Sequence, residues 1–339
     1  MHNLLHLDLL KNGKSLLAYS GGVDSSALFH LLLQNNINFD IAHVNYHTRT
    51  SSDDEANNAM TLAQTHNKLC HLHSCHLVTS NFEHNARQER WEYFASVMKE
   101  HNYAYLLTAH QLNDRLEWML MQLTRGAGLP EMLGISSCDT KGDMMILRPL
   151  LEWDRESIEE YLHIHTIAHS LDESNNDEKY TRNHFRHQFS NPIMSHYSAA
   201  IRRSFRYLQE DCEELIEKVV FTPTDELYYA PASSSERSII FAIDKLLKTL
   251  GFILNTHERH ELLSNKELIV GRKWVIIMNS TWIFIAPYLC DAVLDKKFKE
   301  ECRVLKVHPK LRGFLASNRV AFETIKALLT APLTPLQYD

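Results

Sequence analysis

The sequence predicts an α/β fold: a parallel five-stranded sheet with helices on both faces, then a helical linker and a smaller α+β C-terminal domain. Two observations support this prediction. In the first half of the chain, short apolar runs alternate with stretches of helical periodicity, as they do in parallel sheets covered by helices. From Asp154 the pattern becomes helical and polar, and a hairpin pattern follows later, with a domain boundary near residue 190.

Composition limits the class of protein. The 339 residues, 44% of them hydrophobic, suffice for one large or two medium domains. No apolar stretch approaches the roughly 18 residues of a membrane span, and the first residues lack the pattern of a secretory signal. Six scattered cysteines without a C-x-x-C pair favour free thiols. We therefore expect a cytoplasmic protein with no membrane partner.

The charge of the chain indicates the class of binding partner less clearly than composition indicates the class of protein. The formal net charge of −7 argues mildly against a nucleic-acid partner, but it conceals two basic segments, "TRNHFRHQ" and "DKKFKEECRVLKVHPKLRGF". Each segment is either a solvated face or a surface for phosphate groups.

The elements of the first half follow in order. The predicted strands cover residues 15–19, 39–46, 71–78, 103–110 and 144–151. The predicted helices cover about 25–34, 53–68, 85–101 and 113–124. Ligands of such sheets bind beyond the carboxyl ends of the strands, so we expect the binding residues in the loops at those ends.

The second half is predicted to be helical at first. Asp154 is a suitable N-cap for a helix, residues 200–220 continue as a helix, and residues 221–236 have the composition of a linker. Helices at 237–250 and 256–264 and a hairpin turning at Asn279-Ser280 follow. The predicted domains are 1–190, 191–231 and 232–339.

The loop after the first strand predicts a phosphate site. Ser20-Gly21-Gly22-Val23-Asp24-Ser25-Ser26 lies between a strand and a helix, where free N–H groups and the helix dipole suit an anion. The glycines admit a close approach of the backbone, the serines add donors, and Asp24 can hold Mg²⁺. The alternative is an ordinary glycine turn in which Ser25 caps the helix.

This string resembles the S-G-G-x-D-S loop of the PP-loop ATP pyrophosphatases, a Rossmann-like superfamily that cleaves ATP between its α and β phosphates. Further segments resemble the tRNA(Ile)-lysidine synthase family in order: "HVNYHTR", "ARQERWEYF", "TAHQLNDRLEWML", "LTRGAGLPEMLGI", "RPLL" and "DESNNDEKYTRNHFR". The resemblance covers about residues 14–190.

The resemblance implies a reaction. ATP adenylates the C2 oxygen of the wobble cytidine in the CAU anticodon of an isoleucine tRNA, and the amine of free L-lysine then displaces AMP. The implied cofactors are ATP and Mg²⁺. The oligomeric state is left undecided, with a homodimer as one possibility. The C-terminal domain is expected to contact tRNA.

The resemblance also implies site residues. The catalytic group comprises Asp24, Arg87 and Asp114, with Asp24 as the Mg²⁺ ligand. The nucleotide would contact residues 20–26 (Ser20, Gly21, Gly22, Val23, Asp24, Ser25 and Ser26), His43, Arg125 and Gly126. Lysine would bind Arg90, Asp114 and Glu117, and the base cavity would contain Asp172, Asn175, Asp177, Arg182 and Asn183. Three-residue spacing places Asp114 with Glu117, and Arg87 with Arg90, on one helix face each.

Other interpretations stay open. The paired carboxylates and the paired arginines are also typical of solvated helix faces, and His43 could be a histidine of the core. Arg125-Gly126 could simply end a helix, and the polar residues at 172–183 could form a capped polar loop. The chain also departs from the family pattern at four positions. Asn113 stands where the family usually has an Asp, and Tyr46 stands where it usually has a His. Arg115 and Trp118 replace the usual Gln and Thr. The rival functions are a PP-loop tRNA thiolase and an inactive nucleotide- or tRNA-binding homologue.

Overall fold

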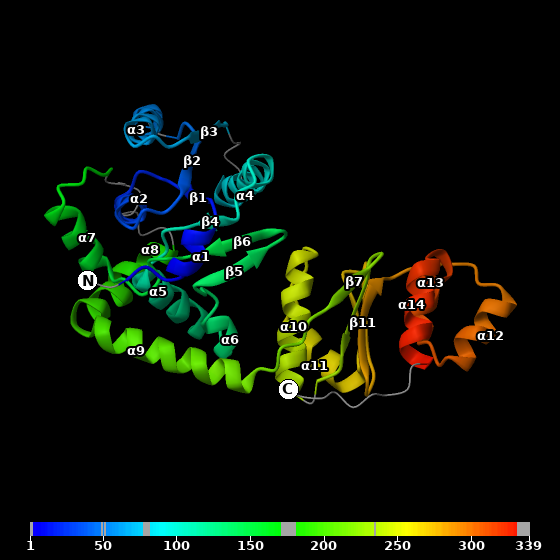
Figure 1. Ribbon diagram of the computed structural model, residues 1–339. Helices are drawn as coiled ribbons and strands as arrows, with labels where there is room; N and C mark the ends of the chain where they lie inside the picture. Colours follow the sequence, from blue (N-terminus) through cyan, green and yellow to red (C-terminus); the bar gives the residue numbers. More distant parts are fainter. Residues whose placement is uncertain are drawn as a thin grey trace. The chain divides into compact units, whose positions relative to one another are not determined.

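The computed structural model describes residues 3–48, 50, 52–76, 82–170, 181–233 and 235–330 (Figure 1). The chain divides into two units, Met1–Glu210 and Asp211–Asp339. Elements of the first unit are α1 (Leu7–Asn12), β1 (Ser15–Ala18), α2 (Val23–Gln34), β2 (Phe39–Asn45), α3 (Ser52–Thr65), β3 (Cys70–Ser74), α4 (Phe82–Glu100), β4 (Tyr105–Leu107), α5 (Leu112–Leu123), α6 (Leu129–Met132), β5 (Cys138–Lys141), β6 (Met144–Leu147), α7 (Arg155–Ile164), α8 (Thr181–Phe185), a π-helical turn η2 (Arg186–Ser190) and α9 (Asn191–Leu215), which ends in the second unit.

The sheet of the first unit has the strand order β3-β2-β1-β4-β6-β5. The five predicted strands are confirmed and pair in parallel, with β1 between β2 and β4. A sixth strand, β5, was not predicted; it pairs antiparallel with β6 at the edge. The strand order reverses between β1 and β4, and a binding crevice is expected beyond the carboxyl ends of these two strands.

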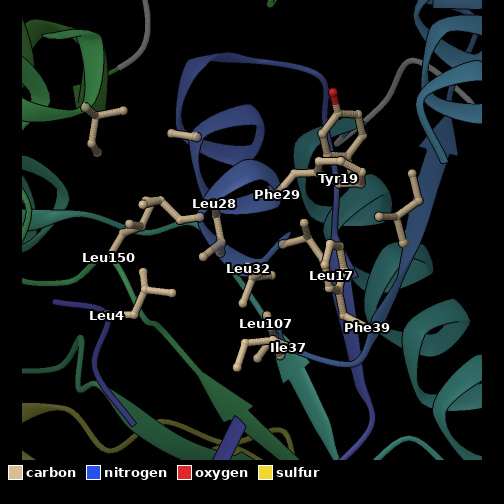
Figure 2. Packing of buried hydrophobic residues seen from close by; sticks show 14 of the residues in the cluster. Leu4, Leu17, Tyr19, Leu28, Phe29, Leu32, Ile37, Phe39, Leu107 and Leu150 are labelled. Carbon is tan, nitrogen blue, oxygen red and sulfur yellow. The ribbon is translucent and has the colours of Figure 1, made fainter. Parts of the chain in front are cut away.

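Helices cover both faces of this sheet, and β1 is therefore buried on both sides. Leu17 packs with Leu28 and Leu32 of α2 in one apolar cluster (Figure 2). Its neighbour Leu16 points the other way and packs with Phe94 of α4. This two-sided burial is typical of parallel sheets and holds the end of β1 firmly in place.

The second unit is built on an antiparallel sheet. Its elements are β7 (Thr222–Thr224), β8 (Leu227–Pro231), α10 (Glu236–Thr249), α11 (Thr256–Asn265), β9 (Glu267–Val270), β10 (Trp274–Met278), β11 (Trp282–Pro287), α12 (Lys296–Val304), a 3₁₀ turn η3 (Pro309–Leu311), α13 (Arg312–Ser317) and α14 (Arg319–Thr330). The strand order is β7-β8-β11-β10-β9.

Two helical layers cover the two faces of that sheet. Ile276 and Ile285 pack with Leu247 and the other apolar residues of α10 and α11. Phe284, on the opposite face, packs with the residues of α12 to α14, including Phe322. The α+β prediction for this part is therefore confirmed.

Two predictions from local sequence patterns, the helix cap at Asp154 and the turn at Asn279, are confirmed, and one, the linker at 221–236, is wrong. The Asp154 side chain accepts the Ser157 N–H at the start of α7, as predicted. The Asn279 side chain accepts two N–H groups at the turn between β10 and β11. The linker predicted at 221–236 was wrong in that it contains strands β7 and β8. Among the described residues, no helix has both the length and the apolar character that a bilayer requires.

Candidate active site

The loop between β1 and α2 has the geometry of an anion site. Gly21 has a φ of +82°, a left-handed conformation that favours glycine. The N-cap of α2 is Gly22, which supplies no side-chain acceptor for the first N–H groups of the helix. These donors and the positive end of the α2 dipole are therefore available to a phosphate group.

Serine hydroxyls fix this loop from inside. Ser25 Oγ donates to Gly22 O over 3.1 Å, and Ser26 Oγ donates to Gly21 O over 3.2 Å. Ser20 Oγ lies 3.1 Å from Ser25 Oγ. Ser25 and Ser26 are buried at the start of α2, so their hydroxyls shape the loop, whereas Ser20 is exposed.

Two residues support the loop from outside. His43 of β2 is buried, and its Nδ1 donates to Tyr19 O over 3.0 Å; burial lowers the pKa of this imidazole. Ser170 N donates to Gly21 O over 2.9 Å and pairs with Gly22 in a short parallel bridge. Ser170 was not predicted, because no sequence pattern links it to a loop 150 residues earlier.

Asp24 is placed to hold a cation. Its Oδ1 is buried and has no hydrogen-bond partner in the described part of the chain. Its Oδ2 lies 3.6 Å from Arg155 Nη1. Burial, assisted by the nearby Asp114 carboxylate, raises the pKa of Asp24 to about 6. An orphaned carboxylate oxygen beside a phosphate loop fits Mg²⁺, which prefers oxygen ligands and phosphate partners.

Helix α5 begins at the end of β4 and presents two more carboxylates. The Gln111 side chain accepts the Asn113 N–H, and Asp114 Oδ2 accepts the Gln111 N–H over 2.9 Å. This capping box fixes Asp114 in the first turn, and Glu117 follows one turn later. Both residues are buried, with Glu117 only 1% exposed.

Two arginines already pair with these carboxylates. Arg182 of α8 donates to Asp114 Oδ1 over 2.5 Å and to Glu117 Oε2 over 2.9 Å. Arg186 donates to Glu117 Oε1 over 2.6 Å. Although burial opposes ionisation, Arg182 and His110 hold the pKa of Asp114 below its usual range. Asp114 and Glu117 therefore form a cation site that guanidinium groups occupy.

A set of cationic groups lies around this cluster. Burial lowers the pKa of Arg87, and the nearby Arg90 and Arg182 lower it further. Burial is the main cause that lowers the pKa of His110 to about 4; the Asp114 carboxylate opposes this shift, and Arg148 adds to it. Within the described residues the Arg87 guanidinium makes no ion pair, which leaves it available to an anion.

A cleft of about 510 Å³ opens at this cluster. Glu117 of α5, Arg155 of α7 and Arg186 of η2 line it, together with residues at the start of α9. Glu117 of the carboxylate cluster therefore faces a space that can admit a substrate.

Other predicted site residues lie elsewhere. Arg125 and Gly126 are exposed and follow Thr124, the C-cap of α5. Their role in nucleotide binding stays a prediction. Asn183 is buried in α8. Asp172, Asn175 and Asp177 lie outside the described residues.

Comparisons with known proteins identify the family. The PP-loop domain family matches residues 2–193. A tRNA(Ile)-lysidine synthase from Wolinella succinogenes is 42% identical over 306 residues, which cover 90% of this chain and 93% of that protein. The chain belongs to the tRNA(Ile)-lysidine synthases. The corresponding protein of Campylobacter jejuni RM1221 is 38% identical over 94% of this chain and 97% of its own, and that of Helicobacter pylori J99 is 36% identical over 91% of each.

The departures from the tRNA(Ile)-lysidine synthase pattern have structural uses here. Asn113 Oδ1 accepts the Arg155 N–H over 3.2 Å and so joins α5 to the start of α7. Arg115 lies 4.4 Å from the ring centroid of Phe205 in α9. Trp118 Nε1 donates to Glu131 O in α6 over 2.8 Å. These three residues anchor the helix that carries Asp114 and Glu117.

Besides Ser170, four residues of this site were not among the predicted ones. Arg186, His110 and Arg148 stand in the quoted family segments, so the sequence did contain a signal for them. Arg155 follows the predicted N-cap Asp154, but nothing local indicates that its side chain reaches Asp24.

Proposed function

We propose that this chain attaches L-lysine to C2 of the wobble cytidine in the CAU anticodon of an isoleucine tRNA. The C2 oxygen attacks the α-phosphate of ATP, pyrophosphate leaves, and the base becomes an adenylate. The lysine amine then attacks C2, and AMP leaves with the former C2 oxygen. One observation supports this most strongly: an uncapped helix after β1 lies beside a buried carboxylate cluster after β4.

The nucleotide is proposed to bind at the β1–α2 loop. The free N–H groups of α2, with the hydroxyl of Ser20, hold the phosphates. Asp24 would hold Mg²⁺, which neutralises phosphate charge when it is bound. Arg155, beside Asp24, adds a guanidinium to the same side. Arg87 serves either the phosphates or the lysine carboxylate, in keeping with its unpaired guanidinium among the described residues.

The lysine is proposed to bind at Asp114 and Glu117. An ammonium group needs carboxylate partners in a buried site, and these two carboxylates already bind cations. The ammonium replaces one guanidinium, and the displaced Arg182 or Arg186 becomes available to the tRNA. Arg90 completes the lysine site as a partner for the substrate carboxylate.

The tRNA is proposed to engage both units. Buried Asn183 is in α8 next to Arg182, which binds the carboxylates, in keeping with a cavity for the activated base. In the second unit, exposed Lys296, Lys297 and Lys299 of α12 provide positive charge for phosphate groups. We place the enzyme in the cytoplasm, where tRNA, ATP and free lysine occur together.

A labelling experiment tests the proposal. The protein is incubated with ATP, labelled lysine and an isoleucine tRNA transcript, and the label is located after digestion to nucleosides. We expect ATP-dependent label at the wobble cytidine, none in a methionine tRNA transcript, and none with Asp24→Asn. The matched control Asp54→Asn, on the exposed face of α3, keeps activity. Pyrophosphate exchange without lysine transfer, or sulfur in place of lysine, would contradict the assignment.

A further inference from the structure

A second cluster of metal-binding side chains lies at the carboxyl end of β3, outside the site described above. His73 is in β3, Cys75 follows the strand, and Glu89 comes from α4. One donor atom from each of the three lies within 4.8 Å of the others. Of the residues that the structure describes, these form the one group of three such side chains around a common point.

The cluster is partly ordered already. His73 Nε2 lies 2.8 Å from Glu89 Oε1. The His73 ring stacks on Tyr93 with a centroid separation of 4.6 Å, which fixes the orientation of the imidazole. All three ligands are half-buried. Burial, assisted by the nearby Glu89 carboxylate, raises the pKa of the Cys75 thiol.

We propose that His73, Cys75 and Glu89 bind Zn²⁺. Imidazole nitrogen, thiolate sulfur and carboxylate oxygen are the zinc ligands of proteins, and three protein ligands leave a fourth position for water. Soft thiolate with imidazole also disfavours Mg²⁺ and Ca²⁺, which need oxygen ligands. Binding releases the proton of the Cys75 thiol and moves the ring proton of His73 from Nε2 to Nδ1, so that two bonds to the metal replace the hydrogen bond between His73 and Glu89.

The neighbouring His47 is not available as a competing ligand. His47 stacks on His76 with centroids 4.4 Å apart. However, His47 Nδ1 pairs with Asp53 over 2.9 Å, and its Nε2 bonds to Ser74 Oγ over 2.6 Å. Both ring nitrogens of His47 are therefore engaged, whereas the Cys75 thiol makes no hydrogen bond to the described residues.

The site would join the end of β3 to α4. Glu89 lies on α4 between Arg87 and Arg90, the two arginines assigned to substrate anions. A metal bond to Glu89 therefore fixes the part of α4 that carries them. This role is independent of the proposed reaction, since neither step of that reaction uses the zinc ligands.

Cobalt provides a direct test, because a Co²⁺–thiolate bond has a charge-transfer absorption band. The metal-free full-length protein is titrated with Co²⁺, and Zn²⁺ is then added. We expect a band that saturates at one equivalent and is lost when Zn²⁺ displaces Co²⁺. Cys75→Ser removes the band, whereas the matched control Cys138→Ser, at an exposed thiol elsewhere, keeps it.

The other two ligands complete the test. His73→Gln and Glu89→Gln are each expected to weaken Zn²⁺ binding at least about tenfold in competition with a chromogenic chelator. Circular dichroism of each metal-free variant shows whether it folds as the wild type does. Absence of the thiolate band, its equal loss in Cys138→Ser, or unchanged zinc affinity in folded Cys75→Ser would overturn the proposal.

Discussion

Arg155 Nη1 lies 3.6 Å from Asp24 Oδ2, so the first turn of α7 meets the first turn of α2. Three contacts hold Arg155 in this position. Asp154 caps the helix immediately before it, Asn113 accepts its N–H, and Arg202 of α9 donates to Asp154 Oδ2 over 2.8 Å. A guanidinium and an incompletely bonded carboxylate thus share the space next to the phosphate loop.

Asp24→Asn is expected to abolish pyrophosphate exchange and to change the pH dependence of stability. Because the pKa of Asp24 rises from 3.8 to about 6 on folding, the folded protein binds a proton between these values that the unfolded chain has lost. The free energy of unfolding therefore falls as pH rises through this window and stays lower above it. Asparagine does not ionise, so the free energy of unfolding of the variant does not fall in this pH window. At neutral pH the variant should therefore be more stable relative to wild type than it is at low pH.

Urea denaturation at about pH 4 and about pH 7 measures the effect. The difference between Asp24→Asn and wild type should be larger at pH 7. Asp54→Asn serves as the control, because its side chain is exposed. An equal difference at the two pH values would show that Asp24 does not carry the raised pKa.

Glu117→Gln is expected to cost about 3 kcal/mol of unfolding free energy. The change leaves Arg186 and Arg182 without one charged partner, and breaking a buried pair costs about 3–5 kcal/mol. The lower end applies because Arg182 is 49% exposed and partly screened by water. Adding Arg186→Gln should cost less than the two single changes together. Strict additivity in urea denaturation would contradict the pairing.

Asp114→Asn is expected to raise the KM for lysine by roughly tenfold or more, because a charged hydrogen bond is worth about 1.5–3 kcal/mol. The KM for ATP in the lysine-independent exchange step should change little. That comparison is an internal control for folding of the site. A normal lysine KM would remove Asp114 from the lysine site.

Asn113→Asp and Asn113→Ala should have opposite effects. Aspartate keeps the acceptor for the Arg155 N–H and adds a carboxylate at a position where the family usually has one. Less Mg²⁺ should then give half-maximal activity. Alanine removes the acceptor and should lower both activity and melting temperature. A Mg²⁺ titration that is identical in wild type and Asn113→Asp would argue that this position does not reach the metal.

Replacing Lys296, Lys297 and Lys299 with glutamine is expected to weaken tRNA binding and reduce its salt dependence. Each lost phosphate contact should lower the slope of log affinity against log salt by roughly 0.9. The triple variant Lys218→Gln, Lys245→Gln and Lys248→Gln makes the same change in net charge at other exposed positions. Equal loss of binding in the two variants would mean that net charge matters and the α12 lysines do not.

The β1–α2 loop could be predicted from the sequence because its signals are local. A strand, two glycines, hydroxyls and a helix follow one another within about twenty residues, and backbone geometry determines the rest. The capping box at Gln111 and Asp114 is equally local.

The pairing of Arg182 and Arg186 with Glu117 could not be predicted in the same way. These partners are 65 and 69 residues apart, and only the packing of α8 and η2 against α5 brings them together. Prolines account for the two strands that were missed in the second unit, β7 and β8. Pro223 is in an edge strand and Pro231 ends β8, positions that tolerate proline although the composition suggested a linker.

The glycine cap of α2 has a consequence for survival of the protein in the cell. A helix that starts without its own acceptor is incomplete until an anion arrives, so substrate occupancy contributes to conformational stability. Starvation that depletes the energy supply would therefore remove a reactant and, at the same time, expose the apoprotein to unfolding and proteolysis.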